Sequence, residues 1–488
     1  MIGLYPEFIY KEAENETMKK AKMNKSRQFL AGTAAGTTSR SWRMFLLMVM
    51  LMFATACSST APSSESSSMP AQTTKESKIE NASESKPSDP PKDTIDHPVT
   101  LTFMAPWDEE SFASRVKNHV EAKFPHVTME LISQVVDEKE LQETFAQGIV
   151  PDILLAHRGF AVLKKVDMLY PLDDMIASHE LDLSKIRSGA IDFLRARDPD
   201  GEQRLLGLPI EEIMNGVFYN KAIFDKFGVE YPHDGMTWDE IIELAKQVTG
   251  ERDGIAYRGL VFNSFQLTVP LMQLSAQGVG PDGNVNFANN PAFTQYYELM
   301  KKIIAIPGNY PEESKASFSN QQITMFMTSA NAFESYSKVE GLDFDVVSMP
   351  SWPDKRNVGS FANPFSYTIS PHSPYKEEAF IVLKYLVSEE MQTILHRNTS
   401  GTVLELPALY DQFGADKIMD DRSFHFSSLY MEQAPMPAFT SYDPETKFYA
   451  FLRDRFKEFQ GMKEDIPTYL RTLEEEYRQI LREEAEAN

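Results

Sequence analysis

Cys57 is the only cysteine among the 488 residues, so no disulfide can form within this chain. Whatever fold the chain adopts must therefore be held by a hydrophobic core rather than by covalent cross-links. Residues 98–488 are long enough to build such a core, and their length favours two domains.

The residues before Cys57 have the composition of an export signal. Two arginines precede a short apolar stretch from Met44 to Thr55, which is too short to span a bilayer. The sequence Ala54-Thr55-Ala56-Cys57 also resembles a bacterial lipobox, after which the cysteine thiol carries a diacylglycerol. We expect residues 1–57 to be a lipoprotein signal peptide, translated from Met1, Met18 or Met23, and Cys57 to be the lipid attachment site, with palmitate among its acyl chains. An ordinary secretory cleavage that leaves a free thiol is the alternative.

Residues 58–97 are rich in serine and proline and contain few large apolar side chains. Such a segment cannot offset the entropy cost of ordering, which predicts a disordered tether. Without residues 1–57 the chain has 40 basic and 67 acidic side chains, a net charge of about −27. This charge disfavours nucleic acid as a partner and disfavours electrostatic attraction to an anionic membrane, so a lipid would have to supply the membrane attachment.

The folded part begins with alternating strands and helices. Residues 99–104 and 127–131 alternate as strands, and residues 151–156 form a third apolar strand. Between the first two strands, apolar residues recur every fourth position from Phe112 to Phe124, as on one face of a helix. This order predicts an α/β fold with a parallel sheet.

Further local patterns place elements in the rest of the chain. Thr237-Trp-Asp-Glu240 predicts a capping box before a helix, and residues 379–395 predict a single amphipathic helix. Asp282-Gly283 predicts a turn before a short strand at residues 284–287, and residues 198–201 predict a hairpin turn. An apolar stripe from Leu470 to Leu481 predicts a last helix that packs on the core.

The sequence offers little for cofactor or metal chemistry. Residues 278–283 match GxGxxG by letter, but they follow a helix-like run and contain a turn, so a nucleotide loop is disfavoured. The nine histidines lack metal-ligand spacing. We therefore expect no catalytic residues, no metal and no cofactor.

Several segments, taken in order, resemble the extracellular solute-binding proteins of ABC importers, family 1, the group of the maltose-binding protein. They run over residues 98–488, and the most specific is Gly207-Leu-Pro209 through Val217-Phe-Tyr-Asn-Lys221 to Thr237-Trp-Asp-Glu240. The other matching segments are residues 103–110, 145–153, 169–174, 323–327, 345–350 and 366–370.

The resemblance implies an α/β, two-lobed periplasmic-binding-protein-like fold of the class II type, with a hinge between the lobes and the ligand in the cleft. Lobe 1 would contain residues 98–209 plus 364–405, and lobe 2 residues 210–363 plus 406–488. The protein would be a monomeric extracellular lipoprotein on the cell membrane of a Gram-positive bacterium. It would not be an enzyme, and it would deliver a carbohydrate to the transmembrane subunits of an ABC permease.

Carbohydrate binding needs flat aromatic faces against sugar C–H groups, with carboxylates and amides for the hydroxyls. We expect Trp107 to stack on a sugar ring, because it follows the first strand at the carboxyl end of the sheet. We expect Trp238 to be a packing residue, and Trp352 to cover a loop. The candidate ligand-binding residues are Trp107, Asp108, Glu109, His157, Arg158, Glu211, Glu212, Asn331, Phe333, Glu334, Asn363 and Tyr442.

Two alternatives stay open. The acidic candidates could suit a polyamine or another cationic solute within the same fold. A secreted glycoside hydrolase would also hold carboxylates and aromatic rings in a cleft, with two carboxyl groups about 5–5.5 Å or 6.5–9.5 Å apart.

Overall fold

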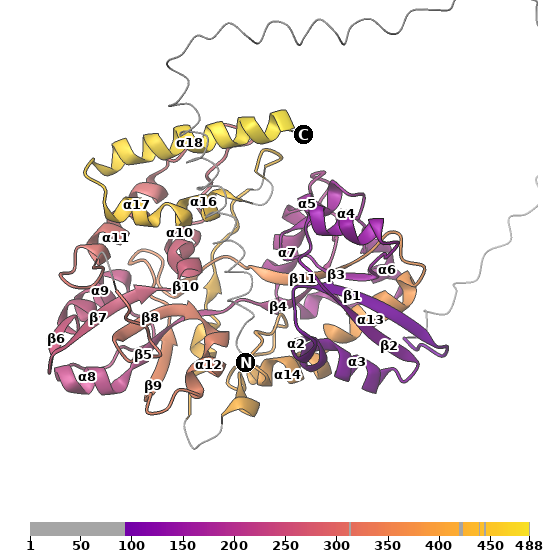
Figure 1. Ribbon diagram of the computed structural model, residues 1–488, viewed down its shortest axis with the longest axis horizontal. Helices are drawn as coiled ribbons and strands as arrows, with labels where there is room; N and C mark the ends of the chain where they lie inside the picture. Colours follow the sequence, from indigo (N-terminus) through magenta and orange to yellow (C-terminus); the bar gives the residue numbers. More distant parts are fainter. Residues whose placement is uncertain (1–92, 312–313, 419–422, 439, 444–445, 488) are drawn as a thin grey trace, which may run out of the picture. The chain divides into compact units, whose positions relative to one another are not determined.

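The computed structural model describes residues 93–488 except 312–313, 419–422, 439, 444–445 and 488. The signal peptide, the lipobox with Cys57 and most of the expected tether lie outside these residues. The described strands form two five-stranded sheets and a small two-stranded sheet (Figure 1).

The first sheet has the strand order β2-β1-β3-β11-β4. The predicted strands are confirmed as β1 (Val99–Ala105), β2 (Val127–Ser133) and β3 (Ile153–Leu155), and β1 pairs in parallel with both β2 and β3. The later strands β4 (Leu208–Glu212) and β11 (Pro364–Ile369) complete the sheet, where β11 runs antiparallel to β3 and to β4. The predicted helical face from Phe112 to Phe124 is buried against this sheet.

The second sheet has the order β6-β7-β8-β5-β9. Its strands are β5 (Asn215–Asn220), β6 (Gly250–Arg252), β7 (Ile255–Phe262), β8 (Ile323–Ser329) and β9 (Phe344–Ser348). In β5 every residue is buried, and the strand lies between β8 and β9, antiparallel to both. The two sheets belong to two lobes (Figure 1).

The chain passes between the two sheets after β4 and again before β11. It leaves β4 at Glu212 and enters β5 at Asn215, and it returns to the first sheet where β11 begins at Pro364. Close to the return point, β10 (Val358–Gly359) pairs with β12 (Glu432–Gln433). These passages lie beside the candidate residues Glu211, Glu212 and Asn363. The lobe boundaries given above stay a prediction.

The helices cover the two sheets, and the longest is the last one, α18 (Figure 1). The predicted capping box is confirmed: the Thr237 side chain accepts from the Glu240 amide, and the Glu240 carboxylate accepts from the Thr237 amide. The described helices are α2 (Glu109–Phe112), α3 (Asn118–Lys123), α4 (Glu138–Ala146), α5 (Phe160–Lys164), α6 (Asp173–Ser178), α7 (Ser188–Ala196), α8 (Lys221–Phe227), α9 (Trp238–Gln247), α10 (Val269–Met272), α11 (Pro291–Ile304), α12 (Phe333–Ser337), α13 (Lys376–Leu386), α14 (Glu389–Arg397), α15 (Pro407–Tyr410), α16 (Phe448–Asp454), α17 (Phe456–Gln460) and α18 (Ile466–Ala487).

Two predicted elements are wrong in detail. The helix expected at residues 379–395 is two helices, α13 and α14, because the Ser388 side chain accepts from the Met391 amide and caps a new helix. The strand expected at residues 284–287 is reduced to a single bridge between Val279 and Val285. The stripe of the last helix is confirmed, with Leu470, Leu473 and Tyr477 buried.

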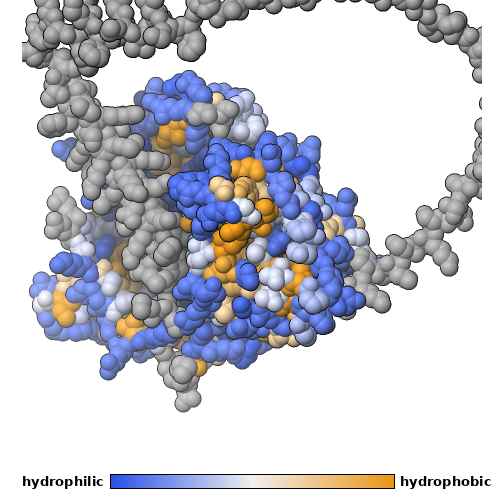
Figure 2. All heavy atoms as spheres, turned by 45° about the vertical axis from the view of Figure 1, so that its right-hand side comes forward, coloured by the Kyte–Doolittle hydropathy of each residue, from blue (hydrophilic) through white to orange (hydrophobic). Residues whose placement is uncertain are grey.

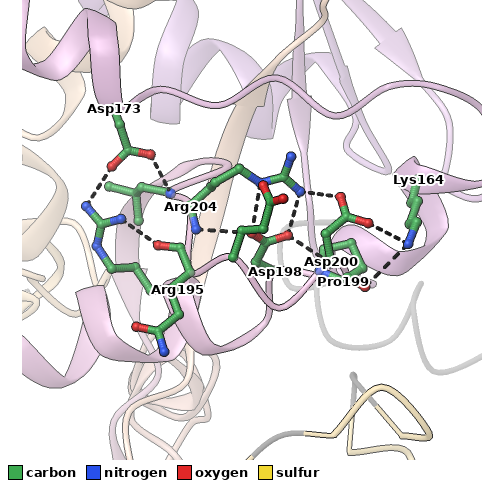
Figure 3. A network of polar contacts seen from close by, with 10 residues as sticks. Lys164, Asp173, Arg195, Asp198, Pro199, Asp200 and Arg204 are labelled. Carbon is green, nitrogen blue, oxygen red and sulfur yellow. Dashed lines mark hydrogen bonds and ion pairs between the residues drawn. The ribbon is translucent and has the colours of Figure 1, made fainter.

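The turn expected at residues 198–201 is present, because the Gly201 amide donates to the Asp198 carbonyl at 3.0 Å, but it connects α7 to β4 and is not a hairpin between neighbouring strands. Charged side chains also hold this loop (Figure 3). Asp198 accepts two hydrogen bonds from the Arg204 guanidinium, at 2.8 and 2.7 Å, and Lys164 reaches Asp200 at 2.6 Å. Asp198 lies almost wholly inside the protein, and Arg204 lowers its pKa against the opposing effect of burial.

Ordered contacts begin before Pro98, within the segment expected to be a tether. Asp93 accepts a hydrogen bond from Lys384 at 2.7 Å and lies 3.3 Å from the ring of His179. Ile95 is buried, and His97 lies 2.9 Å from Glu378. Residues 93–97 are therefore packed against α13 and the end of α6.

Hydrophilic residues cover most of the face shown in Figure 2, with a strip of hydrophobic residues over the part that carries the first sheet. Among the described residues, no helix combines the length and the apolar character needed to cross a membrane. In the same residues no three His, Cys, Asp or Glu side chains gather as metal ligands would.

Candidate functional site

Trp107 follows β1 at the carboxyl end of the first sheet, as predicted, but its indole is packed inside the lobe. Its exposed fraction is 3%. The ring stacks on Phe103 with the centroids 5.4 Å apart and meets the edge of Tyr367 at 6.1 Å. The guanidinium carbon of Arg115 lies over the ring, 5.9 Å from its centroid. Among the described residues, Phe103, Tyr367 and Arg115 surround the ring, and a sugar could stack on it only if one of them moved.

Arg115 links Trp107 to the candidate carboxylate of Glu211. Its Nη1 donates to Glu211 Oε2 at 2.8 Å and to Ser400 Oγ at 3.1 Å. The side chains of Arg115 and Glu211 are 17% and 12% exposed, so this ion pair is only partly screened by water. Burial raises the pKa of Tyr367, which packs in the same cluster, and the Glu211 charge adds to that effect.

Glu212 lies at the passage from β4 to the second sheet and is 5% exposed. Its Oε1 accepts a hydrogen bond from the Asn363 amide at 3.1 Å, so the two candidates are in contact through the backbone of Asn363. Burial raises the pKa of Glu212, and the charge of Arg187 opposes that rise. Gly401 packs against the Glu212 carbonyl so closely that a β-carbon there would collide with it.

Arg187 and two tyrosines form a second charged and aromatic group beside Glu212. The Arg187 guanidinium lies over the Tyr430 ring at 5.4 Å and 3.7 Å from Glu405. Tyr410 and Tyr430 stack face to face, with centroids 3.6 Å apart and an interplanar angle of 6°. This group contains flat rings and a cation, which suit a polar ligand with apolar faces.

The other candidates near the first sheet have structural roles. Asp108 caps α2 by accepting from the Ser111 amide at 2.8 Å, which lowers its pKa, and Glu109 is exposed in the first turn of that helix. Burial lowers the pKa of His157 to about 4. Arg158 lies 3.6 Å from Asp137 and is 41% exposed.

The candidates after β8 point into lobe 2 or bind neighbouring charges. Phe333 is fully buried and packs against Phe344, Phe424 and Phe426. Asn331 accepts from Ser329 at 2.6 Å. Although burial opposes the change, Lys338 and Lys417 lower the pKa of Glu334.

Tyr442 is 54% exposed, and its ring lies over Gly283 in the Asp282–Gly283 turn. No described contact connects it to Trp107 or Glu211.

The two tryptophans of lobe 2 are core residues. Trp238 is 1% exposed and donates to Gln273 at 2.9 Å, which confirms its expected packing role. Trp352 is 5% exposed and donates to the Pro270 carbonyl at 3.0 Å. A hollow of about 360 Å³ lies between α17 and α18, lined by Glu458, Tyr469, Glu476 and their neighbours, and none of its lining residues is a candidate.

The structure thus brings Trp107 and Glu211 together through Arg115, and Glu212 and Asn363 through one hydrogen bond. Sequence reasoning missed Arg115, Arg187, Tyr410 and Tyr430. Arg115 lies in the predicted helix that follows Trp107, but no pattern in the sequence singles it out. The others come from distant segments that only folding brings together.

Comparison with known proteins gives a family and a fold. Residues 117–417 match the family described as bacterial extracellular solute-binding protein. A Brucella abortus (strain 2308) protein that carries only the general name of a binding protein is 24% identical over 268 residues, which cover 52% of this chain and 60% of that protein. The chain therefore spans less than two thirds of that relative's length.

Solved structures share the fold at low identity. The substrate-binding protein Lmo0181 of Listeria monocytogenes in complex with cycloalternan has a TM-score of 0.60 and 19% identity, over 79% of this chain and 99% of its own. The cyclic alpha-maltosyl-1,6-maltose binding protein of Arthrobacter globiformis has a TM-score of 0.60 and 16% identity, over 79% and 100%. UgpB of Mycobacterium tuberculosis, in complex with glycerophosphocholine, has a TM-score of 0.58 and 14% sequence identity, over 79% of this chain and 99% of its own.

These matches confirm the α/β, two-lobed periplasmic-binding-protein-like fold, whose two sheets are described above. The family match covers more than half of the chain. The protein belongs to the bacterial extracellular solute-binding protein family.

Proposed function

We propose that this protein captures a neutral oligosaccharide outside the cell and delivers it to an ABC importer. The observation that supports this most is the cluster of Trp107, Arg115, Glu211 and Tyr367 at the carboxyl end of the first sheet. It combines flat rings with paired charges beside the passage between the sheets. One neighbour of the same fold is in complex with cycloalternan, and another is a cyclic alpha-maltosyl-1,6-maltose binding protein.

The charge balance of the cluster favours a neutral ligand over a polyamine. Glu211 is paired with Arg115, and Glu212 lies in the field of Arg187. A cation would have to compete with these arginines for the carboxylates, and it would gain little free energy from them. A neutral sugar could instead donate hydroxyl hydrogen bonds to the carboxylates without adding a second cation beside the arginines.

Glycerophosphocholine in one neighbour supports a second candidate, a zwitterionic solute. Arginine would hold its phosphodiester, and an aromatic face would hold its quaternary ammonium group. Arg187 could hold the phosphodiester, but the Tyr430 ring beside it already packs against Arg187 and Tyr410, so the ammonium group would have to displace one of them.

The lipid anchor at Cys57, the tether, the delivery to permease subunits, the monomeric state and the two lobe boundaries belong to the same proposal. All twelve candidate residues of the sequence analysis remain candidates, and we give priority to Trp107, Glu211, Glu212 and Asn363. These four lie in or beside the two charged groups near the passages between the sheets.

The test is a titration of residues 93–488 by calorimetry against maltose, maltotriose, mannotriose, spermidine and glycerophosphocholine. We expect binding of a neutral sugar with a decrease in the radius of gyration by small-angle scattering, because the lobes would close. Binding of spermidine alone would show that the ligand is a polyamine rather than a neutral sugar. Binding of glycerophosphocholine alone would show that it is a zwitterionic solute. Release of a reducing sugar on incubation with the oligosaccharides would refute the transport proposal in favour of a hydrolase.

A further inference from the structure

We propose that Arg115 is a displaceable cover on Trp107, held in place by Glu211, which a ligand must push aside before it can stack on the indole. The proposal deepens the function proposed above and rests on it for the identity of the ligand. The cover itself can be tested without any ligand.

The geometry supports a cover. Trp107 is 3% exposed, although it follows β1 at the edge where ligands bind in sheets of this kind. Phe103 and Tyr367 are parts of the sheet beneath it, so they cannot leave without breaking β1 or β11. Among the neighbours of the ring that the structure describes, Arg115 is the one with a long, flexible and polar side chain, and it is 17% exposed. It can rotate towards water at the smallest cost.

The backbone around Arg115 supplies an independent observation. Between α2 and α3 the chain forms a π-helical turn, η1 (Ala113–Lys117), and Arg115 is its central residue. Single π-turns inside helices are rare and occur frequently at functional sites. The turn rotates the residues that follow it relative to a regular helix, and it changes the direction in which Arg115 leaves the backbone.

The ion pair with Glu211 contributes to the free energy that holds Arg115 over the indole. The ion pair measures 2.8 Å, and Ser400 accepts a second hydrogen bond from the same nitrogen at 3.1 Å. The contact of a guanidinium with an indole face adds to this. Each of these interactions is lost when Arg115 moves away, so each reduces the apparent affinity for a ligand that needs the ring.

The first experiment measures quenching of tryptophan fluorescence by acrylamide in residues 93–488 without ligand. The described residues contain three tryptophans, and Trp238 and Trp352 are buried and hydrogen-bonded. The variants are Arg115→Ala, which removes the cover, and Glu211→Gln, which weakens its tie. Arg453→Ala is the matched control, because Arg453 lies 4.5 Å over the ring of Phe265 and contacts no tryptophan that is described.

We expect Arg115→Ala to raise the Stern–Volmer constant clearly, Glu211→Gln to raise it less, and Arg453→Ala to leave it unchanged. Adding Trp107→Phe to Arg115→Ala should abolish the increase, which assigns it to Trp107. A Stern–Volmer constant for Arg115→Ala equal to that of the wild type would overturn the proposal. If Arg115→Ala fails to fold, the Stern–Volmer constant of Glu211→Gln is compared with that of the wild type, and equal values would overturn the proposal.

The second experiment measures the affinity for whichever of maltose, maltotriose and mannotriose binds the wild type. Removing the cover should raise the affinity by about 2- to 30-fold, the equivalent of about 0.5–2 kcal/mol for a cation–π contact. A lower affinity in Arg115→Ala would make Arg115 a direct ligand contact and overturn the cover. If none of these sugars bound, the proposed function would fall, while the quenching result would still decide whether Arg115 covers Trp107.

Discussion

Replacing Trp107 with Ala should affect both the stability and the ligand affinity of this protein. The indole is 3% exposed, and it contacts the rings of Phe103 and Tyr367 and the guanidinium of Arg115. Removal of the ring leaves a cavity at the end of β1 that the surrounding strands can fill only in part.

The magnitude follows from these contacts. A buried aromatic residue changed to Ala typically costs about 3–5 kcal/mol of the free energy of unfolding. Two aromatic pairs are lost at the same site, each contributing about 0.5–1.5 kcal/mol beyond its buried area, so we expect the upper part of that range. Loss of a ring that stacks on sugar should cost a further 1–3 kcal/mol of binding free energy, about 5- to 150-fold in affinity.

The assay pairs urea unfolding, followed by circular dichroism, with calorimetric titration of the same sample. Trp352→Ala is the matched control, because Trp352 is 5% exposed and donates to Pro270 in lobe 2. It should lose stability but keep its affinity once folded. Wild-type stability in Trp107→Ala would refute the packing that the structure shows. Lower stability with unchanged affinity would remove Trp107 from the ligand site.

Three further predictions concern the rest of the chain. Glu212→Gln should gain stability relative to the wild type as the pH rises above about 4.5, because burial raises the folded-state pKa of Glu212 and its ionisation then opposes folding; a difference in melting temperature that stays constant from pH 4 to 8 would contradict this. Lys384→Ala should release Asp93 and expose residues 93–97 to limited proteolysis, with a loss of about 1 kcal/mol or less; an unchanged digestion pattern would argue against it. Cys57→Ser should release the protein from the membrane fraction or leave it unprocessed, and normal cleavage with membrane retention would exclude the lipid anchor.

Local patterns in the sequence predict much of the fold. The alternation in β1 and β2, the capping box at Thr237 and the stripe of α18 each depend on residues within a few turns of one another. The single helix expected over residues 379–395 failed for a local reason as well, because Ser388 can either continue a helix or cap a new one. The amphipathic pattern continues through the break and does not reveal it.

The sequence by itself determined the order of strands and helices, the family resemblance and the position of Trp107 at the end of a strand. Only the tertiary structure decided what surrounds that ring. Arg115 comes from the following helix, Glu211 from β4 and Tyr367 from β11, and their contact depends on sheet order and register. The same holds for Arg187 with Tyr430. Side chains so far apart in the chain leave no periodic signal, because their proximity arises from packing rather than from local conformation.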